Sequence, residues 1–529
     1  MAELDLLIVL IAVSVVLVRL ADLVQIPYPI VLVIAGIGIG FAPIPTEIEL
    51  RPEVIFLVFL PPLLYAAGLT TSAEELKTEA GALGGLVVGL TLATMAAVAA
   101  VSVALIPGFT WLEGFLLGAI VCPTDPVAAV ATFARVGVPK RVAVLVEGES
   151  LINDAVALVL YKVALAAVLT GALTGGEVVS DLVLAVAGGL AVGLAIAWTA
   201  SLMQRRLDDP PLAILLSVVV AYGSYLVAEQ IGASGVLAVV AAGVFSGWRS
   251  PVTQDAETRL TARSFWGALV FALNVILFIL LGLRLPSILD AVSGHLSVWE
   301  MVGYGALVSL VVIVVRLAWQ FGPVSAGRFF SPALRFDTGD GWKERLIVGW
   351  SGMRGAVSLA AALSLPIDID SGLDAGREII VFLAVAVILS TLVLQGLTLP
   401  VLIKAIGLGE KEEWSPEDSE TRVALARAAM EKLEEIESDP PDHLPPGALE
   451  RIRNLYEIRE ERWTRSAAGP DHHDRADRPF DAVAEVRLML IDSERKALDE
   501  LRSAGKISAD SFAGIQRELD LDEARVLNS

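Results

Sequence analysis

One apolar stretch of the 529-residue chain carries polar side chains at a spacing that could bind an ion. The stretch reads EGESLINDAVALVLYK over residues 147–162. On a helix, Ser150 and Asp154 lie one turn apart on the same face, and Asn153 lies beside that face. A second aspartate, Asp125, lies in the nearby stretch CPTDP and is the natural neighbour of this face. Two carboxylates, a hydroxyl and an amide are hard oxygen ligands, which suit a small cation better than a soft metal.

Asp154 could also carry a proton. The four histidines, His295, His443, His472 and His473, lie in a loop or in the charged C-terminal part, so no imidazole is available within the apolar runs. Transfer out of water disfavours the charged form of a carboxylate. We therefore expect a proton and a metal cation to compete for Asp154.

Several other charges lie within the apolar part, where each needs a partner, a water path or a function. Arg354 cannot lose its charge, so it requires a carboxylate nearby. Glu149 is favoured over Glu147 as that partner, in a structural ion pair. Lys162 and Arg316 are predicted to extend their charged ends towards the membrane surface.

The composition indicates a membrane protein with a charged C-terminal part. Hydrophobic residues make up 55% of the chain and charged residues 19%, against about 25% charged residues in a soluble domain. Residues 410–529 hold 18 Lys/Arg and 30 Asp/Glu, a net charge of −12 out of −21 for the whole chain. We divide the chain into a transmembrane domain, 1–409, and an acidic, mostly helical cytoplasmic tail, 410–529. The single cysteine predicts no intrachain disulfide, and the absence of a Cys/His metal spacing predicts no metal cofactor. No other cofactor is expected. The acidic net charge predicts no nucleic-acid partner.

Thirteen runs before residue 410 are apolar enough to cross a bilayer, which takes about 20 residues of helix. They span residues 4–24, 27–43, 52–69, 80–106, 111–135, 140–171, 177–204, 210–229, 234–248, 263–285, 298–327, 342–365 and 377–406. Basic residues favour one set of alternating loops by fourteen to three. This bias places that set and the tail in the cytoplasm, and the N-terminus outside. The expected fold is an all-α multi-pass protein of the cell (inner or plasma) membrane, with the lipid bilayer as its surroundings.

Two of the thirteen runs are interrupted at matching positions. Run 111–135 contains Pro123 and Pro126, each of which removes a backbone N–H and clashes with the preceding turn. Run 342–365 carries glycines on both sides of Arg354, and glycine weakens a helix. If the seventh run is a linker, each interrupted run is the fifth of six. This pattern is typical of transporters built from inverted repeats, whose broken helices meet near the middle of the membrane.

Three stretches of this sequence resemble a known family. CPTDPVAAVATF, GESLINDAVALVLY and GWSGMRGAVSLA are similar, in order and spacing, to bacterial Na+/H+ antiporters of the Na+/H+ exchanger type, in the monovalent cation:proton antiporter family one. Supporting stretches are FLPPLLYAAGL, FILLGLRLP and TLVLQGLTLP, so the resemblance covers essentially all of 1–409. It implies thirteen transmembrane helices in two inverted six-helix repeats with crossed broken helices (spans five and twelve), a homodimer, and an elevator-like motion of a core domain.

The resemblance also implies roles for individual residues. The ion-binding and proton-binding aspartate of the family falls on Asp154, and the asparagine that marks the electroneutral branch falls on Asn153. The ion-coordinating serine falls on Ser150, the carbonyl-donating threonine on Thr124, and the aspartate of the broken helix on Asp125. By this resemblance, Na+ would bind at Asp154, Ser150 and Thr124.

Two further positions carry the resemblance or depart from it. Glu149 and Arg354 match the family's glutamate–arginine pair. The stretch LPPLLYAAGL has Ala66 where some archaeal members carry a glutamate that helps to hold a water on the ion. This departure leaves Na+, Li+ and K+ open as the transported cation.

The predicted function is antiport of Na+, or Li+, against H+ by competition at Asp154, with K+/H+ exchange at the same site as the alternative. A cation channel is less favoured, because the sequence contains no ring-forming filter motif. An enzyme is not expected, because no mid-membrane His or Lys is placed to activate Ser150. The tail is predicted to form helices over 415–437, 448–465, 480–503 and 508–526 with a loop over 466–479, and its regulatory or assembly role is left open.

Overall fold

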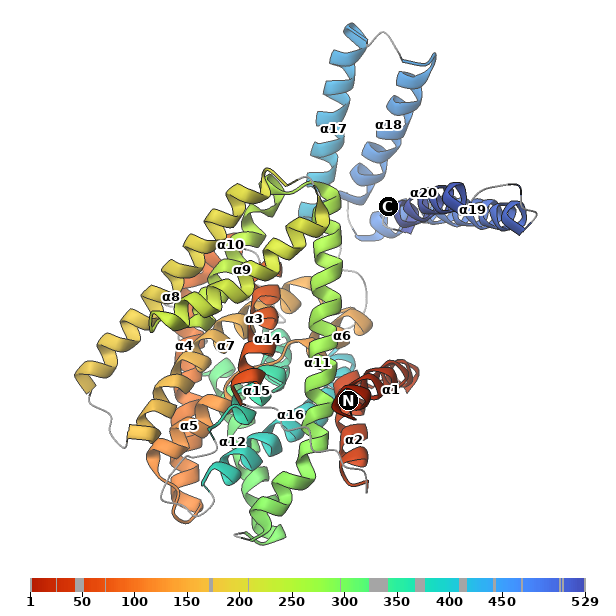
Figure 1. Cartoon of the computed structure of the whole chain (residues 1–529). Helices are drawn as coiled ribbons and strands as arrows, with labels where there is room; N and C mark the ends of the chain where they lie inside the picture. Colours follow the sequence, from red (N-terminus) through yellow and green to blue (C-terminus); the bar gives the residue numbers. More distant parts are fainter. Residues whose placement is uncertain are drawn as a thin grey trace. The chain divides into compact units, whose positions relative to one another are not determined.

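The structure is a computed structural model of the whole chain. It describes residues 2–527 except 25, 43–51, 72, 171–174, 208, 295, 323–340, 367–375, 409–415, 441–443, 468–469, 504–505 and 507–508. Every regular element in these described ranges is a helix (Figure 1), so the predicted all-α fold is confirmed for them. The chain folds as two compact units, Met1–Glu410 and Lys411–Ser529.

The first unit is a series of helices. They are α1 Ala2–Val24, α2 Tyr28–Gly40, α3 Pro52–Thr70, α4 Ala73–Leu105, α5 Trp111–Val121, α6 Val127–Val136, α7 Lys140–Thr170, α8 Gly175–Gln204, α9 Pro210–Gln230, α10 Gly235–Thr253, α11 Ala256–Ser293, α12 Val298–Phe321, α14 Gly341–Trp350, α15 Ala356–Leu363 and α16 Gly376–Ile406. Polar caps set several of the starts. Ser234, Asp255 and Ser297 each accept a backbone N–H at the start of α10, α11 and α12. Such caps satisfy N–H groups that have no partner within the helix.

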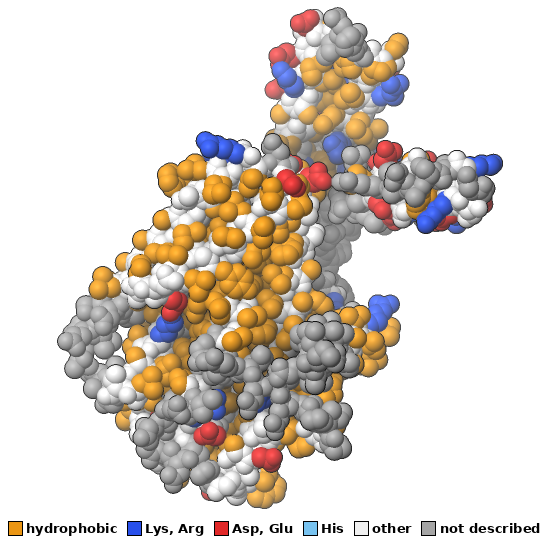
Figure 2. Space-filling view, viewed as in Figure 1, with side chains coloured by type: hydrophobic (Ala, Val, Ile, Leu, Met, Phe, Trp, Pro, Cys, Tyr) orange, Lys and Arg blue, Asp and Glu red, His pale blue; other side chains and the backbone are white. Residues whose placement is uncertain are grey.

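The first unit is built to cross a membrane. Among the described residues, eight of its helices are long and apolar enough to span a bilayer, and shorter apolar helices include Tyr28–Gly40 and Trp111–Val121. Figure 2 shows hydrophobic side chains spread over the face that α8 and α9 form. Large exposed side chains of these two helices include Leu184, Trp198 and Leu215. An apolar surface of this extent is unfavourable in water, so the protein is a multi-pass membrane protein.

The helices of the first unit pack in two groups. In one, the scaffold group (α1–α3 and α8–α11), α2 packs along α11, and α3, α8 and α9 pack against α10. In the other, the core group (α4–α7, α12 and α14–α16), α5 packs against α4 and α7, and α12 packs against α4 and α16. Contacts between the groups, such as those of α3 with α15 and of α7 with α10, are less extensive.

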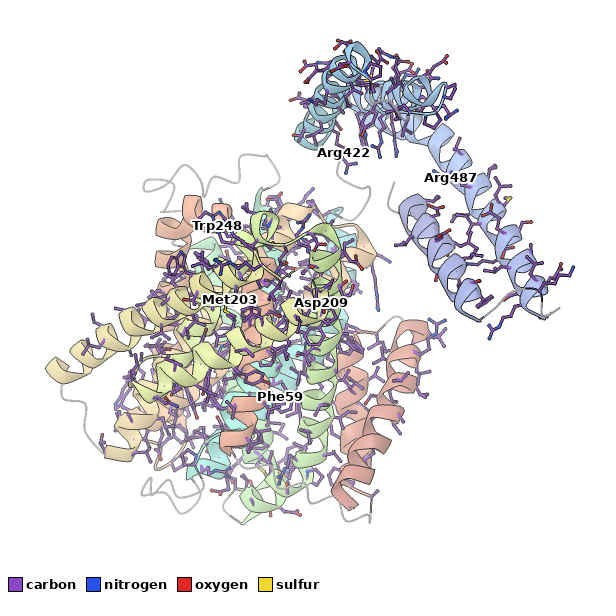
Figure 3. All side chains as sticks on the ribbon, turned by 45° about the horizontal axis from the view of Figure 1, so that its top comes forward. Phe59, Met203, Asp209, Trp248, Arg422 and Arg487 are labelled. Carbon is purple, nitrogen blue, oxygen red and sulfur yellow. The ribbon has the colours of Figure 1, made fainter. Side chains whose placement is uncertain are left out.

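The second unit contains α17 Pro416–Ser438, α18 Ala448–Ala467, α19 Pro470–Ser503 and α20 Ala509–Leu527. The first two helices pack together, and the guanidinium of Arg422 on α17 lies 4.2 Å from the ring centroid of Trp463 on α18. Figure 3 labels Arg422 on α17 and Arg487 on α19. The last two helices form a hairpin, as predicted, around a small buried cluster of Ile491, Leu498, Leu519 and Val526.

The predicted loop over 466–479 is wrong for most of its length. Helix α19 begins at Pro470 and continues through Pro479. A proline at the first helical position lacks only an N–H that has no helical partner, so Pro470 can begin the helix. The Pro/Asp/His composition of this stretch therefore does not mark a loop.

Candidate functional site

Two non-helical segments cross in the interior of the core group. Helix α5 ends at Val121 and α6 begins at Val127, while α14 ends at Trp350 and α15 begins at Ala356. The backbone N–H of Asp125 donates to the Met353 carbonyl at 2.8 Å, and Ser358 Oγ donates to the Pro123 carbonyl at 3.1 Å. These bonds join the two segments directly.

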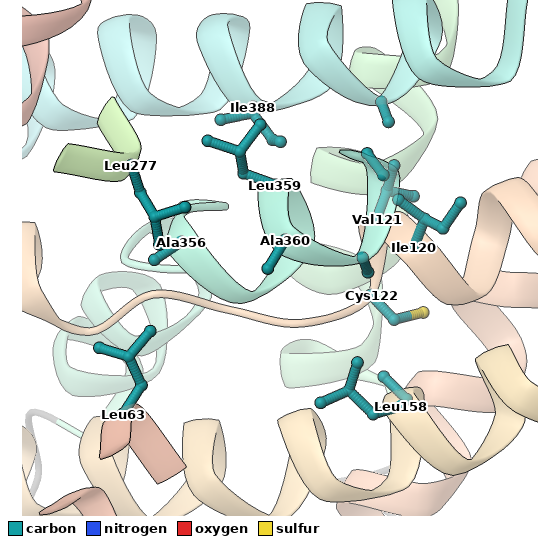
Figure 4. Close-up of a cluster of buried hydrophobic side chains, with 14 of the residues drawn as sticks. Leu63, Ile120, Val121, Cys122, Leu158, Leu277, Ala356, Leu359, Ala360 and Ile388 are labelled. Atoms are coloured by element: carbon teal, nitrogen blue, oxygen red, sulfur yellow. The ribbon is translucent and has the colours of Figure 1, made fainter. Parts of the chain in front are cut away.

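The crossing is surrounded by buried apolar side chains. Figure 4 shows Ile120, Val121 and Cys122 beside Ala356, Leu359 and Ala360, with Leu158 of α7 and Ile388 of α16 close by. Water has little access to such a region, so polar groups inside it need protein partners or a ligand.

Three polar side chains of α7 bind the backbone of Cys122 and Thr124, in the segment between α5 and α6. Asp154 Oδ1 accepts a hydrogen bond from the Thr124 N–H at 3.0 Å. Ser150 Oγ donates to the Thr124 carbonyl at 2.5 Å, and Asn153 Nδ2 donates to the Cys122 carbonyl at 2.8 Å. The structure thus brings together Asp154, Asn153, Ser150 and Thr124, all buried, which sequence reasoning proposed as one site.

Of the two carboxylate oxygens of Asp154, one accepts a hydrogen bond and the other has no protein partner among the described residues. Its Oδ1 is the acceptor for the Thr124 N–H. Within the described part of the chain, Oδ2 has no hydrogen-bond partner. This oxygen can take a proton or a cation without breaking the bond that fixes the carboxylate. Ser150 Oγ points its proton at a carbonyl, so its lone pairs also remain available to a cation.

Asn153 is held on both sides of its amide group. Its Nδ2 binds the Cys122 carbonyl, and its Oδ1 accepts a hydrogen bond from Thr91 Oγ1 of α4 at 2.7 Å. Thr91 is buried, and sequence reasoning missed it. Its only sequence signal is a hydroxyl in an apolar run, which many membrane helices contain.

Asp125 lies at the crossing and caps two helices at once. Its Oδ1 accepts from the Val127 N–H at 2.9 Å, at the start of α6, and its Oδ2 accepts from the Ala356 N–H at 3.4 Å, at the start of α15. Helix N-termini stabilise a carboxylate through free N–H groups and the helix dipole. A Cβ at position 355 would overlap Asp125 Oδ2, so Gly355 provides the space in which Asp125 reaches α15.

The predicted ion pair between Glu149 and Arg354 is wrong, because Glu149 pairs with a different arginine, Arg316. Glu149 Oε1 pairs with Arg316 Nη1 of α12 at 2.7 Å, and the side chains are 8% and 2% exposed. Arg316 also donates to the carbonyls of Gly349 and Val348, each at 3.2 Å. The predicted extension of Arg316 to the membrane surface is therefore wrong as well.

The reason lies in the geometry of the crossing. A Cβ at position 352 would overlap the Arg316 side chain, so Gly352 opens the path by which Arg316 reaches Glu149. Arg354 instead binds the carbonyls that the interrupted helices leave free. Its Nε donates to the Val121 carbonyl at 2.8 Å, and its Nη1 donates to the Gly352 carbonyl.

Lys162 is also paired, and not simply extended towards solvent. Its ammonium forms an ion pair with Glu229 of α9. Glu229 lies at the end of its helix, and sequence reasoning did not single it out. The partner of Lys162 could not be identified from the sequence, because the pairing depends on the distance between α7 and α9 in the folded protein.

A multi-pass membrane unit with a buried aspartate facing an oxygen-lined break between helices defines a membrane transporter for a small ion. Residues 7–405 match the family described as "Sodium/hydrogen exchanger, transmembrane". The chain belongs to the sodium/hydrogen exchanger family. Its members are cation/proton antiporters and not catalytic enzymes.

Individual relatives agree with this membership. An uncharacterized Na+/H+ exchanger of Mycobacterium bovis is 31% identical over 486 residues, 91% of this chain and 88% of that protein. A sodium, potassium, lithium and rubidium/H+ antiporter of Bacillus pumilus is 32% identical over 78% of this chain and 62% of that protein. The structure of a sodium proton antiporter from Methanocaldococcus jannaschii matches with a TM-score of 0.61 at 21% identity, over 78% of this chain and 99% of that one. The last similarity supports the fold.

Proposed function

We propose that the protein exchanges Na+ for H+ across the membrane, with both ions competing for Asp154. The observation that carries the proposal is the single uncommitted oxygen of a buried aspartate, next to a serine hydroxyl and a freed carbonyl. A cation would bind Asp154 Oδ2, Ser150 Oγ and the Thr124 carbonyl. A proton on Asp154 would cancel its charge and expel the cation.

The expected stoichiometry is electroneutral. Asn153 is an amide whose two polar atoms bind Cys122 and Thr91, so it adds no charge that varies during transport. Asp125 is engaged as a double helix cap. One titrating carboxylate then exchanges one monovalent cation for one proton.

We further propose that the core group carries Asp154 past the scaffold group in an elevator-like motion. The less extensive contacts between the two groups support this division. Counting α5 with α6 and α14 with α15 as interrupted spans gives thirteen spans, and we propose that twelve of them form two inverted six-helix repeats with the seventh as a linker. The proposal includes a homodimer in the cell membrane, with the N-terminus outside and the tail in the cytoplasm, as the loop charges suggest.

K+/H+ exchange at the same site is the second candidate. The relative from Bacillus pumilus is described as transporting potassium, lithium and rubidium besides sodium, which supports a site of low selectivity. Ala66, buried on α3, offers no side-chain oxygen to complete the shell of a bound ion. Selectivity would then rest on carbonyls and waters.

Exchange by purified protein in liposomes tests the proposal. Vesicles loaded with a pH-sensitive dye report proton flux when Na+, Li+ or K+ is added outside. We expect Na+-dependent flux that Asp154→Ala abolishes. Asp209→Asn, at an exposed position before α9, is the matched control and should transport normally. Normal exchange by Asp154→Ala would refute the site, and a response to K+ above that to Na+ would favour the second candidate.

A further inference from the structure

An ion pair links the core group to the scaffold group at a distance from the cation site. Lys162 of α7 pairs with Glu229 of α9, and their side chains are 33% and 34% exposed. Lys162 lies two helical turns beyond Asp154 on α7. The helix that carries the ion site is therefore tied directly to a helix of the other group.

Glu229 is fixed on the scaffold side. Its Oε1 also accepts a hydrogen bond from the Gly235 N–H at 2.9 Å, at the start of α10, where the helix dipole favours a carboxylate. A Cβ at position 235 would lie 2.7 Å from this oxygen, so glycine is needed for the approach. The Ser234 N–H donates to the Ala185 carbonyl of α8 at 2.9 Å. The carboxylate is thus anchored where α8, α9 and α10 meet.

Tyr161, the residue next to Lys162 on α7, contacts both groups. The Tyr161 hydroxyl lies 3.3 Å from Ser364 Oγ, directly after α15. The Tyr161 ring also stacks on Phe56 of α3, with ring centroids 5.8 Å apart, and this is a second contact between the groups. A contact between rings changes gradually when two surfaces slide. An ion pair is lost once its N and O atoms separate beyond about 4 Å, and a slide of one helical turn, about 5.4 Å, would separate them.

We propose that the Lys162–Glu229 ion pair is a reversible link that must open each time the core group moves along the scaffold group. The inference rests on the proposed antiport by core motion. Lys162 and Glu229 are positioning residues that favour the arrangement seen here, and they are not ligands of the cation. Because each partner is about one-third exposed, the expected bias on the conformational equilibrium is about two- to fivefold.

Charge variants test the link in the full-length protein in liposomes. Lys162→Met and Glu229→Gln should each change the turnover by about two- to fivefold, and the double variant should change it no further. The exchange of the two charges, Lys162→Glu with Glu229→Lys, should return turnover towards the native value. Lys432→Met breaks an exposed pair with Glu435 in the second unit and is the matched control. Single effects that simply add, or a charge exchange no better than either single variant, would overturn the proposal.

A reversible cross-link tests the requirement for opening. In the double variant Lys162→Cys with Glu229→Cys, a bifunctional, reducible thiol reagent joins the two introduced thiols. The native Cys122 is buried. We expect cross-linking to stop exchange and reduction to restore it, while each single-cysteine variant treated in the same way continues to exchange. Exchange by cross-linked protein at its uncross-linked rate would overturn the link. Failure of the proposed function would show differently, as no cation-for-proton exchange by the native protein.

Discussion

Loss of either partner of the Glu149–Arg316 ion pair should destabilise the membrane unit strongly. The pair is almost fully buried, with side chains 8% and 2% exposed and atoms 2.7 Å apart. Removal of one partner leaves an unpaired buried charge, which costs about 3–5 kcal/mol. Arg316→Met also removes hydrogen bonds to the Gly349 and Val348 carbonyls, each contributing about 1 kcal/mol or more. Arg316→Met should therefore be more severe than Glu149→Gln.

A double-mutant cycle measures the pairing itself. The free energy of unfolding is followed by reversible SDS denaturation in mixed micelles for the native protein, both single variants and the double variant. In the double variant no buried charge is left unpaired, so the coupling between Glu149 and Arg316 should be about 2–3 kcal/mol. The matched cycle replaces Arg354 by Met together with Glu149→Gln. Because Arg354 binds backbone carbonyls, its coupling to Glu149 should be clearly smaller.

The opposite order of the two coupling free energies would contradict the pairing of Glu149 with Arg316. A coupling of Glu149 to Arg354 larger than that to Arg316 would mean that Arg354 neutralises Glu149 in the membrane. The sequence-based pairing would then be correct, and Gly352 would have no role in admitting the Arg316 side chain. Additive effects in both cycles would mean that neither arginine is a specific partner.

Three further predictions concern the ion site. Gly355→Ala should displace Asp125 and reduce exchange at least tenfold, which corresponds to about 1.4 kcal/mol or more in the barrier. Gly148→Ala on α7, where an added Cβ would meet open space, should exchange normally. Equal activity of the two variants in the liposome assay would contradict the steric argument. Thr91→Val should leave the buried Asn153 carbonyl unsatisfied and lower the unfolding free energy by about 1–3 kcal/mol, whereas Thr199→Val, at an exposed position on α8, should not. The apparent KM for Na+ should rise as the pH falls, because protons compete for Asp154, with little change in the maximal rate; a KM independent of pH would exclude competition at one carboxylate.

Local features of the chain could be predicted from the sequence, because their causes are local. Pro123 and Pro126 bracket a segment that lacks helical hydrogen bonds, and the helical spacing of Ser150 and Asp154 places both on the side that faces it. The apolar runs before residue 410 and the hairpin at the end of the chain follow from hydrophobic patterning in the same way.

Partner choice could not be predicted, because it depends on tertiary distances. Two arginines, Arg316 and Arg354, compete for one glutamate, and the outcome depends on a missing Cβ at position 352. Thr91 is one hydroxyl among many, and nothing in the sequence places it against Asn153. The predicted loop at 466–479 is wrong because a stretch rich in proline and charge can be helical: α19 begins at Pro470, where proline is tolerated, and continues through Pro479.

The continuous hydrogen bonding through residues 124 and 125 has a thermodynamic consequence. Asp154 binds the Thr124 N–H, and the next N–H along the backbone, that of Asp125, binds the Met353 carbonyl in the other interrupted segment. A change at Asp154 therefore acts on a peptide unit whose neighbour is fixed to the second half of the core. Thermodynamic linkage makes this coupling reciprocal. If ion binding shifts the conformation of the second segment, a change in that segment must alter the affinity for the ion by the same free energy. Substitutions around Met353, which is not one of the proposed cation ligands, should be measurable as changes in the dissociation constant of the ion.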